Sequence, residues 1–206
     1  MIHLIKAEYM IDKDKLFQRL KIKKDSSASK VAEKTFKKLL RIIDENLELT
    51  NIYMLKEKTF KFDFYELDNC QQHVYCFSSA SDKIVRKIDD LMNNKEYFEA
   101  YMVNDIVFNA SAYMDQRIKQ DISSKGLQLG KKAFPGENGL DFKHQKSILD
   151  LLKKNIEIDA ELTESYMIKP EKSMIYVFGV GNDIEECSTE HDCALCDIKE
   201  CMYRKI

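Results

Sequence analysis

Four of the six cysteines in this 206-residue chain lie within fifteen residues near its C-terminal end, in the spacing C-x5-C-x2-C-x4-C. They are Cys187, Cys193, Cys196 and Cys201. Thiolates are soft ligands, and four of them complete either a tetrahedral zinc site or a 4Fe-4S cluster. One compact, irregular group favours a cluster, because zinc ribbons pair two separated C-x2-C knuckles. Two disulfides would need an oxidising compartment, and nothing in the sequence directs export.

Two further groups could take part in metal chemistry, but packing explains them better. His191 could replace a cysteine ligand, although a solvent-exposed bystander is the preferred interpretation. Cys70, His73 and Cys76 form a smaller group, and Cys76 falls within an expected strand. Buried free cysteines behave as small hydrophobic side chains, so we expect packing rather than ligation here.

The second stretch with chemical potential is residues 126–181, which hold both prolines and all six glycines of the chain. The backbone geometry that only these residues supply is therefore concentrated here. Pro135 and Gly136 predict a turn, and Asp141 is placed to cap a helix. Its apolar positions near a 3.6-residue period are Phe142, Ile148, Leu151 and Leu152. The apolar run at 174–180 predicts a buried strand.

This order of pieces resembles the activation domain of cobalamin-dependent methionine synthase, including its stand-alone versions. The matching pieces are Pro135-Gly136, Gln145, Leu162-Thr163-Glu164-Ser165-Tyr166, Pro170 and Ser173. The resemblance covers residues 126–180 and is looser upstream. The tail is also similar to the cysteine tails of stand-alone relatives. The resemblance implies a single curved domain centred on a sheet.

In that family the domain binds S-adenosylmethionine and presents it to inactive Co(II) cobalamin, so that one electron and one methyl group restore methylcobalamin. The resemblance places the ligand turn at Lys132, Pro135, Gly136 and Glu137, with Tyr166 nearby. The family has an arginine where this chain has Lys132, and a tyrosine where it has Glu137. Its acidic position on the long helix corresponds to Asn109.

The function implied is that of an accessory protein for the reductive activation of a cobalamin-dependent methionine synthase or a related corrinoid protein. The iron-sulfur cluster would carry the electron, and S-adenosylmethionine is the expected second ligand. The alternative is a non-catalytic, zinc-stabilised module that docks on a corrinoid protein. Whether the chain is itself an enzyme depends on which of these two functions is correct.

Helices and strands that position these residues are expected to form one α+β domain over residues 1–181, followed by a metal-binding tail over 182–206. Strands cluster and then helices cluster, which favours a largely antiparallel sheet flanked by helices. Expected strands are 52–55, 59–67, 73–78 and 173–180. Expected helices are 12–20, 27–46 with a stripe of Val31, Phe36, Leu40, Ile43 and Leu47, 82–92, and 97–122 as the longest.

Composition excludes two broad classes of partner. A net charge of -2 gives no general reason to expect nucleic acid or an acidic membrane. No run of eighteen apolar residues occurs, so we expect a cytoplasmic protein without a membrane span. Basic residues are in excess in the first fifty positions and acidic ones after Gly181, which we interpret as solvated helix faces.

Overall fold

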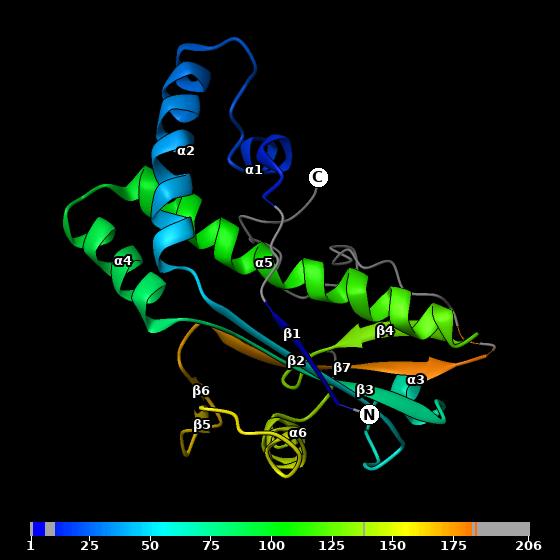
Figure 1. The fold of residues 1–206 in the computed structure, drawn as a ribbon. Helices are drawn as coiled ribbons and strands as arrows, with labels where there is room; N and C mark the ends of the chain where they lie inside the picture. The colour runs from blue at the N-terminus through cyan, green and yellow to red at the C-terminus, as the bar shows by residue number, and fades with distance from the viewer. Residues whose placement is uncertain (1, 7–10, 138, 183, 185–206) are drawn as a thin grey trace.

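A five-stranded sheet forms the centre of the chain in a computed structural model that describes residues 2–6, 11–137, 139–182 and 184 (Figure 1). The strands lie in the order β1-β2-β3-β7-β4, and each neighbouring pair is antiparallel. This confirms the predicted α+β class with a flanked antiparallel sheet. The strands are β1 Ile2–Lys6, β2 Leu49–Glu57, β3 Gln72–Ala80, β4 Gln128–Ala133 and β7 Ser173–Gly181.

Helices cover the sheet on both sides: α5 (Tyr97–Ser124) on one face and α6 (His144–Lys153) on the other (Figure 1). Side chains of β7 alternate between them, so that Tyr176 and Phe178 lie on the α5 side and Val177 lies on the α6 side. Because both faces are buried, the strand is apolar at nearly every position. This explains why residues 174–180, which were predicted to form a buried strand, are apolar.

A second helical layer packs against the first half of α5. It consists of α1 (Lys13–Arg19), α2 (Ser27–Asn46) and α4 (Asp82–Asn93). Its core includes Leu16, Phe36, Leu39, Ile43, Ile84, Leu91, Met102 and Ile106. Both α2 and the long helix occur where the sequence predicted them.

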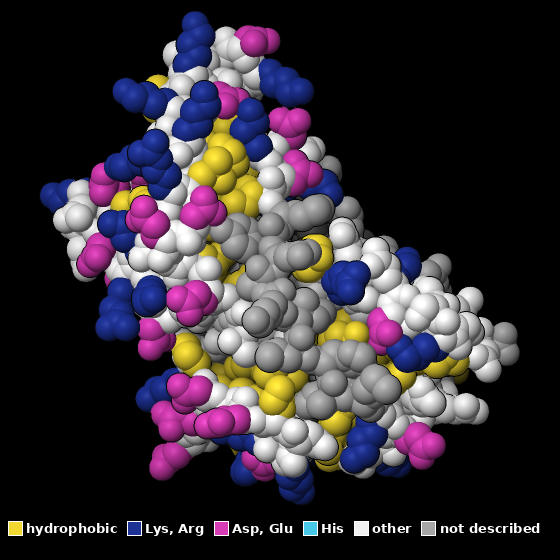
Figure 2. All heavy atoms as spheres, viewed as in Figure 1, with side chains coloured by type: hydrophobic (Ala, Val, Ile, Leu, Met, Phe, Trp, Pro, Cys, Tyr) yellow, Lys and Arg dark blue, Asp and Glu magenta, His cyan; other side chains and the backbone are white. Residues whose placement is uncertain are grey.

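Ser26 caps α2, since the Ser26 hydroxyl accepts from the Ser29 amide at 3.1 Å. One detail of the helix differs from expectation. Val31 is 60% exposed and does not join the buried stripe, whose place is taken by Ala32 one position later. Figure 2 shows basic side chains, many of them on α2, at the end of the molecule that this helix forms, in the upper left of the view.

The strand predicted at 59–67 is wrong. Residues 58–64 form an irregular loop, followed by the short helix α3 (Tyr65–Asp68). Since Glu57 at the end of β2 already pairs with Gln72 at the start of β3, the segment between them must leave the sheet. Phenylalanines of this segment are nevertheless buried, with Phe62 and Phe64 packed into the core on the α6 side.

Three sheet features lie outside the sequence predictions: β1, β4, and a small hairpin of β5 (Glu161–Leu162) and β6 (Ile168–Lys169). Among the described residues, no helix is both long and apolar enough to cross a membrane.

Candidate functional site

The predicted ligand turn follows β4, which is the outer strand of the sheet beside β7. Three backbone hydrogen bonds close it: Glu137 donates to Phe134 at 3.0 Å, Leu140 to Glu137 at 2.9 Å, and Gly136 to Leu140 at 2.6 Å. Pro135 is buried, whereas Glu137 is exposed. The turn is therefore a rigid corner whose acidic side chain faces solvent.

Gly136 meets two separate requirements in this turn. Its φ of +94° lies in the left-handed region that favours glycine. A Cβ at this position would also overlap the ring of Phe142. Phe142 thus covers one side of the turn, although the residue remains 43% exposed. The prediction that glycine supplies special backbone geometry here is met by both observations.

Lys132 points toward α5, where it forms a buried ion pair. Its ammonium Nζ lies 2.8 Å from Oδ2 of Asp115, and the hydroxyl of Tyr176 donates to Oδ1 of the same carboxylate at 3.0 Å. The Asp115 side chain is 3% exposed and that of Lys132 is 19% exposed. A carboxylate this deep needs both partners, because an unpaired buried charge is costly.

Three aromatic rings surround the same ammonium. Nζ lies 3.8 Å from the ring centroid of Tyr176, 5.0 Å from that of Phe134, and 5.9 Å from that of Phe178. A cation within about 6 Å of an aromatic face is attracted by the ring quadrupole. Lys132 therefore occupies an aromatic cage that is closed by a carboxylate.

Burial sets the proton positions in this cluster. It raises the pKa of Asp115 above its ordinary value, while the charge and hydrogen bond of Lys132 and the hydrogen bond of Tyr176 lower it. Burial also raises the pKa of Tyr176 well above its ordinary value, with the neighbouring Asp115 adding to the effect. Tyr176 thus keeps its proton and acts as the hydrogen-bond donor.

Tyr166 lies in the loop of the small hairpin, on the α6 side of the sheet. It lines a surface hollow of about 410 Å³ together with Lys146, Asp150 and Thr163. Its φ of +61° is uncommon for a bulky residue. Because Lys132 points to the α5 side, this arrangement does not bring the two predicted ligand residues together. Lys132, Pro135, Gly136 and Glu137 do share one corner.

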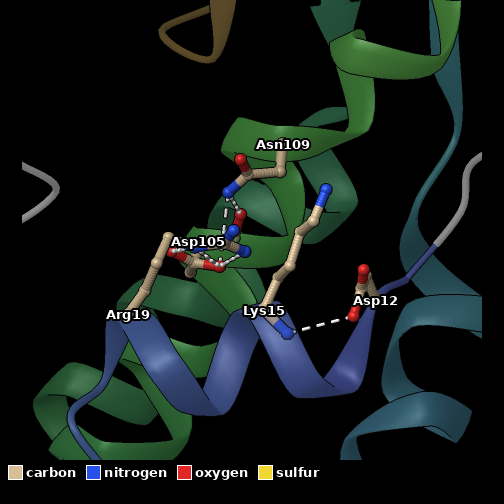
Figure 3. Close-up of polar contacts among 5 residues, drawn as sticks. All are labelled: Asp12, Lys15, Arg19, Asp105 and Asn109. Atoms are coloured by element: carbon tan, nitrogen blue, oxygen red, sulfur yellow. Dashed lines mark hydrogen bonds and ion pairs between the residues drawn. The ribbon is translucent and has the colours of Figure 1, made fainter. Parts of the chain in front are cut away.

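A second buried carboxylate lies on α5 near Asn109 (Figure 3). Asp105 is 1% exposed and accepts from both Nε and Nη2 of Arg19, at 2.9 and 2.6 Å. The Asn109 amide donates to the Asp105 carbonyl at 2.6 Å. Sequence inspection missed Asp105 and Asp115, which are the acidic residues that α5 buries. Each is already paired with a cation of the chain itself.

The four tail cysteines lie outside the described residues. Within the described part, Cys70 and Cys76 are free and buried, and no group of three or more His, Cys, Asp or Glu side chains could hold a metal ion. His73 and Cys76 lie on opposite faces of the sheet, and the His73 nitrogens contact Leu67 O at 2.8 Å and Tyr75 Oη at 3.2 Å. Burial raises the pKa of the Cys76 thiol, as expected for a packing residue.

Comparisons with known proteins identify the fold. No family model and no curated protein matches the chain. Among solved structures, the crystal structure of the MetH reactivation domain bound to AdoHcy matches with a TM-score of 0.62 and 12% sequence identity, covering 95% of this chain and 83% of that one. The chain therefore has the fold of the MetH reactivation domain, as the sequence resemblance predicted.

Proposed function

We propose that this chain is an accessory protein for the reductive activation of a cobalamin-dependent methionine synthase or a related corrinoid protein. A 4Fe-4S cluster on Cys187, Cys193, Cys196 and Cys201 serves as its electron carrier, and the corner after β4 takes S-adenosylmethionine. The observation that carries the proposal is the extent of the fold likeness, which spans 95% of the chain to a reactivation domain bound to AdoHcy.

The corner offers an S-adenosyl ligand a different set of contacts from an arginine clamp. Lys132 already neutralises Asp115, so its charge is committed inside the protein. Because Asp115 and three aromatic rings surround this ammonium, the contacts that remain for a ligand at the corner come from the turn itself. The exposed Glu137 suits the ammonium of the ligand's amino acid part better than its carboxylate.

The point where the tail begins supports an electron path to the same edge. The Ile184 amide donates to Oε1 of Gln128 at 3.3 Å, at the first residue of β4. Lys132 lies four residues along β4 from Gln128, which is about 14 Å at strand spacing. Ile184, the last described residue before the tail cysteines, thus lies beside the strand that leads to the ligand corner.

The donor set fits either metal centre. Four thiolates suit an iron-sulfur cluster as well as zinc, and the cluster would supply one-electron transfer at low potential. The zinc form would staple the tail without redox chemistry, and the chain would then act only by docking on a corrinoid protein. This second function remains the alternative, because no described residue distinguishes iron-sulfur from zinc binding.

The test is ligand binding followed by reactivation. Titration calorimetry with S-adenosylmethionine should give heat with the wild-type chain and none with Pro135→Ala combined with Gly136→Val, whose added side chain collides with Phe142. Gly126→Ala is the control, since that glycine also has a positive φ but has open space around it. A Co(II) methionine synthase without its own activation domain should recover methylcobalamin absorbance when the chain, a reductant as the electron source and S-adenosylmethionine as the methyl donor are all present. If no heat is observed at millimolar ligand, the proposed S-adenosylmethionine site is wrong, and docking on a corrinoid protein is the part of the proposal that remains.

A further inference from the structure

The surface hollow between α6 and the β5–β6 hairpin has two rims of opposite charge. One rim is a face of α6, where Lys146, Asp150 and Lys153 recur at helical spacing and the lysines are in excess. The other rim is the hairpin, which brings Glu161 and Glu164 to the same hollow and lies beside α6 in Figure 1. We propose that this hollow of about 410 Å³ is a binding site for a small zwitterion with an apolar side chain, an aliphatic α-amino acid.

The charges of each rim pair along the rim and not across the hollow. Lys146 Nζ lies 2.6 Å from Asp150 Oδ2 within α6, and Lys169 Nζ lies 3.8 Å from Glu161 Oε1 within the hairpin. Glu164 is exposed, and no ion pair joins it to another described residue. Exposed pairs of this kind contribute little stability, so their members can exchange for a ligand at small cost. A ligand that carries both a carboxylate and an ammonium can therefore bridge the lysine rim and the glutamate rim.

Two leucines add apolar surface to the same hollow. Leu149 of α6 is 3% exposed, and Leu162 of β5 is partly buried. Both belong to the core cluster on the α6 side of the sheet. An aliphatic side chain of the ligand gains by covering this surface, while its charged groups stay at the solvated rims. The combination favours an aliphatic amino acid over a wholly polar zwitterion.

Tyr166 lines the hollow in a backbone conformation that suits glycine better than tyrosine. Its φ of +61° lies in the left-handed region, which is costly for a residue with a Cβ. The loop holds it there, since the Tyr166 amide donates to the Thr163 carbonyl at 2.9 Å and the Met167 amide donates to the Thr163 hydroxyl at 3.0 Å. Residues held in such conformations cluster at ligand sites. The strain therefore indicates that the ring serves contact with a ligand.

The hollow is separate from the ligand corner of the proposed function. Lys132 points to the α5 side of the sheet, whereas the hollow lies on the α6 side. S-adenosylmethionine also contains an amino acid part, so a variant must distinguish the two sites. Glu164→Gln should weaken leucine binding and leave the heat of S-adenosylmethionine binding unchanged. Loss of both together would place the hollow within the S-adenosylmethionine site and overturn the inference, whereas failure of S-adenosylmethionine to bind the wild type leaves the inference intact.

Titration calorimetry on the full chain with L-leucine tests the site. The two matched probes are 3-methylbutan-1-amine, which lacks the carboxylate of leucine, and 4-methylpentanoate, which lacks its ammonium. Leucine should bind about tenfold more tightly than either, because only the zwitterion makes a charged hydrogen bond to both rims. Equal binding of the three compounds, or no heat from leucine at millimolar concentration, overturns the proposal.

Two variants assign the binding to the hollow. Glu164→Gln should weaken leucine binding about tenfold and should not weaken that of 4-methylpentanoate, which has no ammonium for Glu164 to meet. Glu171→Gln is the control, since this exposed glutamate lies outside the lining of the hollow. Tyr166→Gly should lose leucine binding while its melting temperature stays equal or rises, because glycine relieves the left-handed backbone. Unchanged leucine affinity in either variant overturns the proposal, and because Glu164 is exposed, its test does not depend on folding.

Discussion

Lys132 Nζ lies 2.8 Å from Asp115 Oδ2, and this contact joins the outer strand of the sheet to the middle of its longest helix. The residue that the family resemblance assigns to a ligand is thus also part of the internal structure. Substituting it tests stability as well as binding, and the two effects need separate measurements.

Replacing Lys132 with alanine should lower the free energy of unfolding by about 3–5 kcal/mol, the usual cost of leaving one member of a buried pair without its partner. Lys131→Ala removes a solvent-exposed pair and should cost about 0–1 kcal/mol. Urea unfolding at pH 7 measures both. Equal small effects would show that the Asp115 carboxylate is not held charged by Lys132.

The cost of Lys132→Ala should shrink as the pH falls from 7 toward 4. Asp115 has a raised pKa in the folded chain, so proton binding favours folding, and this stability is lost as the pH rises through the folded pKa. Removing Lys132 removes the charge and hydrogen bond that lower this pKa, so the pKa rises further. Urea unfolding of variant and wild type at several pH values checks this, and a pH-independent difference would contradict it.

Neither Asp115 nor its role could be predicted from the sequence. The spacing of seventeen residues between the pair carries no periodic signal, and the partnership depends on how α5 crosses the sheet. β4 was also missed, because Gly130, Lys131 and Lys132 lower its apolar content and outer strands need less of it. By contrast, long periodic helices and the apolar β7 were predictable, since their burial shows in the order of residue types.

The loop at 58–64, where the sequence predicted a strand, also shows that the order of residue types does not decide how a segment pairs. Phe60, Phe62 and Phe64 alternate with polar residues as a half-buried strand would, yet a loop laid over the core buries Phe62 and Phe64 and partly buries Phe60. Sheet membership depends on a neighbour to pair with, and β2 and β3 already pair up to Glu57 and Gln72. Tyr166 could not be placed opposite Lys132 for a similar reason, since the side of the sheet is set by the path of the chain.

Arg19→Lys should destabilise the chain almost as much as Arg19→Ala. Arg19 binds Asp105 with two nitrogens, and a lysine cannot reproduce this fork (Figure 3). We expect a loss of about 2–4 kcal/mol, toward the lower part of the range for breaking a buried pair because the Arg19 side chain is 27% exposed. Hydrogen exchange should show the loss in α1. Lys13→Ala, which breaks an exposed pair with Glu33, is the control, and an equal effect there would contradict the prediction.

Gly179→Ala should cost about 1–3 kcal/mol by overpacking. An added Cβ would overlap the sulfur of Cys70 and lie 3.2 Å from the Glu66 carbonyl oxygen. Cys70→Ala removes that sulfur, so the double variant should recover part of the loss, a coupling that a double-mutant cycle measures by urea unfolding. Strict additivity of the two substitutions would show that the sulfur is not the obstacle.

The last prediction is that Cys187, Cys193, Cys196 and Cys201 hold one 4Fe-4S cluster. Four thiolates within fifteen residues suit a metal centre, and the tail starts beside Gln128, on the sheet edge that also carries the ligand corner. Delivery of an electron to Co(II) cobalamin needs a low potential, which iron-sulfur clusters reach.

Anaerobically reconstituted protein should therefore be brown and contain about four iron and four sulfide per chain, the composition of such a cluster. Cys193→Ser or Cys196→Ser should bleach it, because each removes one of four ligands. Cys70→Ala and Cys76→Ala are the matched controls, since both thiols are buried in the folded body and should leave the spectrum unchanged. Stoichiometric zinc, no visible absorption, and full reactivation of a corrinoid partner by the tail variants would together refute the electron-carrier role and favour the zinc-stapled docking module.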